Sequence, residues 1–167
     1  MIDQEKLATI THLEEGAHNP DGQFCIMEAV AYVMGEKWTD HPACVCPVLA
    51  AYARAINDRM PDAQRQRLLP FIPLLANTRA NPDVERRRMF YLLDKCLDAE
   101  YGWVWDLAAV ASFASEYLQS FADCEYAKAK ASEAAGVAGL VASRIATRGN
   151  TWDAALEVLS QAINIKE

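Results

Sequence analysis

Residues 24–47 read FCIMEAVAYVMGEKWTDHPACVCP, and this stretch decides how the first half of the chain is expected to fold. Its first part is apolar at helical spacing and ends before a glycine, which predicts a buried helix over residues 24–34. The apolar positions are Phe24, Met27, Val30, Ala31 and Met34. Periodicity alone also permits a strand of this length. The second part, residues 36–46, is expected to be a non-helical connection between Gly35 and Pro47.

Downstream, prolines divide the chain into short helices. A helix that begins at a proline is expected over residues 47–60, because a proline in the first helical turn sacrifices no hydrogen bond. A second helix, capped by Asp62, is expected over residues 62–69. Pro70 and Pro73 must then bend the chain, since each removes an N–H donor and crowds the preceding turn.

Apolar periodicity and capping residues predict further helices on both sides of this region. Small residues, mainly alanine, dominate the long helical patterns of the second half. The remaining expected helices cover residues 3–15, 82–101 with Asn81 as the cap, 103–121, 125–148 and a final segment capped by Thr151.

Taken together, the patterns predict an all-α protein with about seven to eight helices and no strand. All seven prolines lie in the first half, and the second half is Ala-rich. Neither a Gly/Ser linker nor an internal repeat separates the halves, so we expect residues 1–167 to form a single compact domain.

The composition restricts the classes of function. Hydrophobic residues make up 52% of the 167 residues, enough for a core, and the formal net charge is −7. This acidity disfavours nucleic acid as a partner, because nonspecific affinity for phosphates comes from Lys and Arg. No apolar run could span a bilayer and no signal peptide is apparent, so we expect a soluble protein with no membrane partner.

Five cysteines, an odd number at irregular spacing, indicate free thiols and a reducing, cytoplasmic location. They are Cys25, Cys44, Cys46, Cys96 and Cys124. His41, Cys44 and Cys46, joined by Cys25 or His18, are the candidate ligands of a structural zinc ion. Packed free thiols are the alternative, since buried cysteine often acts as a small apolar side chain.

The same stretch holds the candidate binding residues. Glu28 stands among apolar positions of the expected helix, and a carboxylate there must reach solvent or a donor such as Trp38 or His41. Glu28, Asp40 and His41 could therefore anchor the connection or form a ligand or catalytic pocket. A cysteine nucleophile with His41 or His18 as its base is a further possibility. Phosphate-binding glycine loops, GxSxG, HExxH and EF-hand motifs are absent.

Two segments, FCIMEAVAYV (residues 24–33) and GExWTDHPxCVxPV (residues 35–48), resemble a family of small uncharacterised proteins from bacteriophages and bacterial genomes. The likeness covers about residues 24–88, including LPxIP at 69–73. It implies a phage or mobile-element origin but no established activity. It also implies one cluster in which a cysteine at position 46 is not a fixed member. The implied cluster is Cys25, Glu28, Trp38, Asp40, His41 and Cys44.

Three functions follow as hypotheses. The first is a non-enzymatic phage or mobile-element protein that binds a host or phage protein, possibly as a homo-oligomer, for example an anti-CRISPR-like inhibitor of bacterial defence. The second is a small enzyme or ligand-binding protein with a pocket around Glu28, Asp40 and His41. The third is a helical DNA-binding protein that uses Arg86, Arg87 and Arg88. If the protein is phage-encoded, we expect it in the host cytoplasm.

Overall fold

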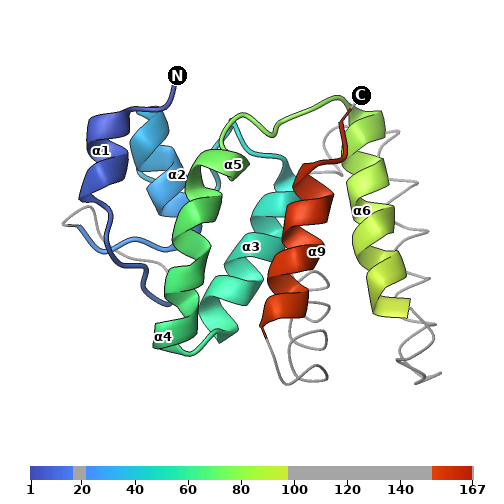
Figure 1. Ribbon diagram of the computed structural model, residues 1–167. Coiled ribbons are helices and arrows are strands. Elements are labelled where there is room, and N and C mark those ends of the chain that lie inside the picture. The colour runs from blue at the N-terminus through green and yellow to red at the C-terminus, as the bar shows by residue number, and fades with distance from the viewer. Residues whose placement is uncertain (17–21, 98–151, 167) are drawn as a thin grey trace.

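The computed structural model describes residues 1–16, 22–97 and 152–166, and all regular structure in these ranges is helical (Figure 1). The all-α prediction is therefore confirmed for the described residues. The helices expected over 103–121 and 125–148 lie outside them. The elements are α1 (Gln4–Thr9), α2 (Ile26–Met34), α3 (Pro47–Arg59), α4 (Asp62–Arg65), the 3-10 helix η1 (Gln66–Phe71), α5 (Ile72–Leu75), α6 (Pro82–Leu97) and α9 (Asp153–Ile163).

Helix α3 is central to the described part of the fold. It packs against α2, α6 and α9, while α2 also contacts α1 and α5 (Figure 1). The hydroxyl of Tyr52 on α3 donates to the carbonyl of Ala155 on α9 at 3.2 Å, so the two helices are bonded as well as packed. Among the described helices, none combines the length and the apolar character needed to cross a bilayer.

The boundaries of α2 follow from local signals. Its first turn is closed by Glu28, whose Oε2 accepts a hydrogen bond from the Cys25 N–H at 2.8 Å. Its end is set by Gly35, which adopts the left-handed conformation with φ of 70°. Glycine takes this conformation without the strain that a Cβ adds. The helix predicted over residues 24–34 is thus confirmed, and the strand alternative is wrong.

The first helix is shorter than predicted, because it ends at Thr9 and not at Glu15. Ile10 after it has an extended backbone, and residues 11–14 have no regular secondary structure. The Gln66 side chain accepts from the Leu13 N–H at 2.8 Å and donates to the Leu13 carbonyl at 3.0 Å. The Glu14 N–H donates to the carbonyl of Phe24 at 2.8 Å. These distant partners replace the hydrogen bonds of a continued helix.

The proline-rich region is divided into short helical pieces, as expected, and the first division comes before Pro70. Pro61 occupies the N-cap position of α4, where we expected Asp62, and the α-helix ends at Arg65 instead of continuing to Leu69. The tighter 3-10 helix η1 follows and contains Pro70. A 3-10 turn suits a short connector of this kind.

Helices α6 and α9 begin close to the predicted positions. Asn81 caps α6, since its Oδ1 accepts from the Val84 N–H at 3.0 Å, and Pro82 is the first helical residue, as predicted. The predicted end of this helix, Tyr101, lies outside the described residues. So does Thr151, and the N-cap residue of α9 is Trp152.

Asn57 connects three segments of the fold from a fully buried position on α3. Its Oδ1 accepts from the Ile26 N–H at 3.2 Å, and its Nδ2 donates to the Glu14 carbonyl at 2.8 Å. Its own carbonyl accepts from Nε of Arg65 at 2.8 Å. One amide therefore holds the start of α2 and the segment after α1 against the end of α3.

We predict that Asn57→Ala lowers the free energy of unfolding by about 2 to 4 kcal/mol, because one buried and one partly buried main-chain group lose their partner. Urea denaturation at neutral pH measures the change. Gln64→Ala is the control, since it removes only an exposed hydrogen bond to Arg67, and its effect should stay within about 0.5 kcal/mol. Equal stability of the two variants would contradict the role assigned to Asn57.

Candidate functional site

The connection between α2 and α3, residues 36–46, is folded around the carboxylate of Glu36. Its Oε2 accepts from the Ala43 N–H at 2.7 Å and its Oε1 from the Cys44 N–H at 3.0 Å. Burial pushes the pKa of Glu36 upward, but hydrogen bonds from the Cys44 thiol and these two N–H groups outweigh it. The pKa of Glu36 is therefore lower than its ordinary value.

Glu28 lies in the first turn of α2. Only 2% of it is exposed, and Oε2 accepts from the Cys25 N–H. A carboxylate at this position was expected to reach solvent or a donor. The donor is the main-chain N–H of Cys25, the N-cap residue of the same helix. The capping bond gives Glu28 a structural function.

Trp38 helps to hold the connection against the core. The centroid of its ring lies 5.2 Å from the ring centroid of Phe24. The Phe24 centroid lies 5.1 Å from that of Tyr32. The Nζ of Lys6 on α1 lies 4.9 Å from the centroid of Tyr32 and extends the cluster. Trp38 is only partly buried. It precedes Asp40 and His41 by two and three residues in the sequence.

Asp40 and His41 lie together with Arg54 of α3 at the candidate site, where His41 is exposed, Asp40 is half-buried and Arg54 is mostly buried. The Asp40 carboxylate lies 3.5 Å from Nε2 of His41 and 3.8 Å from Nε of Arg54. The Arg54 guanidinium also donates to the Asp40 carbonyl at 2.7 Å. Burial lowers the pKa of Arg54, and the nearby Asp40 carboxylate opposes that change.

Arg54 is the member of this group that the sequence analysis missed. It stands in the run AYARAI, residues 51–56, as the charged residue of an otherwise apolar and alanine-rich turn. A cation in such a run needs an anionic or carbonyl partner when the helix is packed. The need for such a partner could have pointed to Arg54 from the sequence. Asp40 provides the partner, through its carbonyl and its carboxylate.

The three described cysteines are free thiols in different surroundings. Burial, with a contribution from Glu28, raises the pKa of Cys25 to about 12. Burial also raises the pKa of Cys46 and of the half-buried Cys44. Raised pKa values disfavour the thiolate that a cysteine nucleophile needs. His18, the other candidate base, lies outside the described residues.

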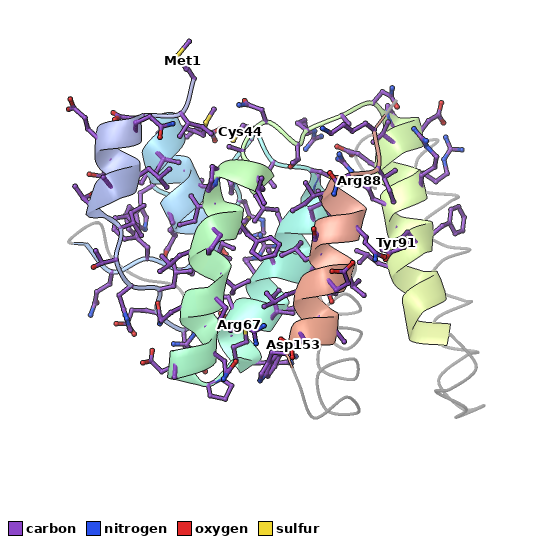
Figure 2. All side chains as sticks on the ribbon, in the orientation of Figure 1. Met1, Cys44, Arg67, Arg88, Tyr91 and Asp153 are labelled. Atoms are coloured by element: carbon purple, nitrogen blue, oxygen red, sulfur yellow. The ribbon has the colours of Figure 1, made fainter. Side chains whose placement is uncertain are left out.

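The candidate zinc ligands are not brought together in the described part of the chain. The described His, Cys and carboxylate residues form one group that could hold a metal ion, and Cys25, His41, Cys44 and Cys46 are not in it. Cys44 faces Glu36, whereas Cys46 lies near Glu85 and Arg88. Figure 2 likewise separates Cys44 from Arg88. The group that is assembled consists of His12, Glu14 and Asp62.

The arginines of α6 are bonded within the chain. Arg88 is 3% exposed and donates to the carbonyls of Thr78 at 2.6 Å and Ile165 at 3.2 Å. Arg87 donates to the Lys166 carbonyl at 2.6 Å, and Arg86 pairs with Asp83. Figure 2 shows Arg88 where α6 meets the C-terminal segment. Two of the three arginines thus hold that segment.

Comparison of the chain with protein-family models, with curated proteins and with solved structures gave no match. The resemblance to phage and bacterial proteins noted from the sequence stays a prediction.

We predict that the stability of the protein falls as the pH drops through the lowered pKa of Glu36. A carboxylate whose pKa is depressed by folding stabilises the native state above its unfolded pKa, and this contribution is lost on protonation. In Glu36→Gln, stability at neutral pH should fall and its dependence on acid should flatten, measured as urea midpoints between about pH 3 and 7.

Glu157→Gln is the matched control for this prediction, because Glu157 is exposed on α9. Its acid dependence should follow that of the wild type. If Glu36→Gln and Glu157→Gln gave the same curve, the two N–H groups would not depend on the Glu36 carboxylate.

We further predict that Glu28→Ala and His41→Ala differ strongly in stability. Glu28→Ala removes a buried cap from α2 and should cost about 1 to 3 kcal/mol. His41 is 68% exposed at its side chain, so His41→Ala should change stability by less than about 0.5 kcal/mol. Thermal unfolding followed by circular dichroism compares the two, and an unaffected Glu28→Ala variant would refute the structural assignment.

Proposed function

We propose that this protein is a non-enzymatic binding protein of phage or mobile-element type, which acts by docking onto a host or phage protein. An inhibitor of a bacterial defence system is the concrete form we favour. Three observations support the proposal. The buried polar side chains bond the main chain, the chain is acidic, and its sequence resembles phage proteins.

The observation that carries the proposal concerns the six buried polar residues of the described part. Each of them bonds at least one main-chain group. Every buried side-chain nitrogen or oxygen there has a partner. An enzyme directs some of its buried polar side chains toward the substrate. These six side chains instead form hydrogen bonds with the backbone. The six are Glu28, Asn57, Arg65, Thr78, Glu85 and Arg88.

A braced scaffold suits a docking protein, because a surface that is already ordered loses less conformational entropy on binding. The formal net charge of −7 favours a partner with a basic surface. Nucleic-acid-binding effectors of bacterial defence have such surfaces, and charge complementarity raises both the association rate and the selectivity.

We predict that expression of the protein restores phage plating in one strain of a panel in which each strain carries a single defence system. The purified effector from that strain should form a stoichiometric complex with the protein. Its association rate should fall by about tenfold or more on going from low to physiological salt, as steered association does. Unchanged plating in every strain, with no complex by gel filtration, would contradict the proposal.

Charge-reversal variants locate the docking face. Glu5 on α1 and Glu157 on α9 are both exposed and lie on separate helices. Glu5→Lys and Glu157→Lys carry the same change in net charge, so each is the control for the other. A docking face on one side of the molecule should make one variant lose affinity and leave the other close to the wild type.

A second candidate is a ligand pocket around Glu28, Asp40 and His41. The contact of Asp40 with both His41 and Arg54 favours it, because an imidazole and a guanidinium beside one carboxylate could hold a small polar ligand. Binding that is lost in Asp40→Asn and His41→Ala with the fold intact would support this candidate. DNA binding through Arg86, Arg87 and Arg88 has less support, since Arg87 and Arg88 bond other parts of the chain and Arg86 pairs with Asp83.

A further inference from the structure

Two exposed side chains and one half-buried side chain lie together where the segment after α1 meets the start of α4. His12 and Glu14 come from that segment, and Asp62 is the first residue of α4. One possible ligand atom from each residue lies within 4.8 Å of the other two. The group is separate from the α2–α3 connection and has no part in the function proposed above.

The backbone positions of this group are held by distant side chains. Gln66 bonds both main-chain groups of Leu13, and Asn57 bonds the Glu14 carbonyl. Leu13 is fully buried. His12 and Glu14 flank Leu13, and both of their side chains reach the surface, with exposed fractions of 46% and 39%. Asp62 is reached by the Gln66 side-chain amide at 3.3 Å.

The distances in the group suit a shared cation better than direct hydrogen bonds. Nε2 of His12 lies 3.2 Å from the Asp62 carboxylate and 3.5 Å from that of Glu14. Charge-assisted hydrogen bonds are shorter, about 2.7 to 2.9 Å. Ligands about 2.0 to 2.1 Å from a tetrahedral zinc ion lie about 3.3 Å from one another. The two measured separations fall on either side of that value.

The charges around the group leave a cation to be bound. Arg65 approaches Asp62 at 3.3 Å, but its guanidinium also pairs with Glu15 at 3.5 Å. Three carboxylates, those of Glu14, Glu15 and Asp62, therefore lie around one guanidinium. Their summed charge exceeds that of Arg65 by two, which is the charge of one divalent ion.

We propose that His12, Glu14 and Asp62 bind a divalent transition-metal ion such as zinc. One imidazole and two carboxylates supply three ligands of the kinds that zinc takes, and the exposure of the group leaves a fourth position to water. The bound ion would join residues 12–14 to α4, two segments that are far apart in the sequence.

Titration of the chelator-treated full-length protein with zinc chloride tests the proposal, by calorimetry and by thermal unfolding. We expect one zinc ion per chain and a melting temperature that rises with zinc concentration. In His12→Ala and in Glu14→Gln the affinity should fall by about tenfold or more, since even the loss of an outer hydrogen-bond partner of a ligand costs that much.

Glu157→Gln is the matched control for Glu14→Gln, because Glu157 is exposed on α9 and does not belong to the group of possible metal ligands in the described residues. It should bind zinc as the wild type does. Cobalt(II) in place of zinc should give no thiolate charge-transfer band, since no cysteine belongs to the group. Circular dichroism of each variant checks that the fold is kept.

Three results would overturn the proposal. They are the absence of zinc binding at millimolar concentration, equal affinity in His12→Ala and the wild type, and a cobalt–thiolate band that places the ion on the cysteines. The last result would support the zinc site predicted from Cys44 and Cys46. None of these results depends on the docking function.

Discussion

The described part of the structure depends on the side-chain amide of Asn57. It lies at the end of α3 and bonds the main chain at Ile26, just inside α2, and at Glu14, in the segment after α1. The Ile26 N–H is buried and the Glu14 carbonyl is partly buried, so both gain from a partner within the chain. The amide supplies an acceptor for one and a donor for the other, and it fixes how α2 sits on α3.

Other polar side chains continue this bracing. Arg65 closes the end of α3 by donating to the carbonyls of Asn57 and Met60. Thr78 accepts from the Cys46 N–H, and Arg88 joins the Thr78 carbonyl to the C-terminal segment. The chain therefore uses polar groups to order irregular connections between short helices. Such a body offers a preformed surface, which is the property that a docking protein requires.

The candidate site shows how far sequence reasoning extended. It identified Glu28 as a carboxylate that must reach either solvent or a donor, and the structure provides a donor, the Cys25 N–H. It placed Asp40 and His41 in a non-helical connection, and they lie there side by side. It did not identify Arg54, because a single helical arginine is usually solvated. It also grouped His41 with Cys44 and Cys46 from their spacing, yet the thiols have different neighbours, since spacing along a loop does not set the direction of a side chain.

By itself, the sequence determined what depends on neighbouring residues: the helical character of the described ranges, the stop at Gly35, the start at Pro47 and the cap at Asn81. Backbone preference and capping act over a few residues, so a local pattern contains them. Tertiary structure decided where α1 ends and which atoms satisfy the buried polar groups. Asn57 and Ile26 are 31 residues apart, and Tyr52 and Ala155 are 103 apart. Such partners meet only after the helices have packed.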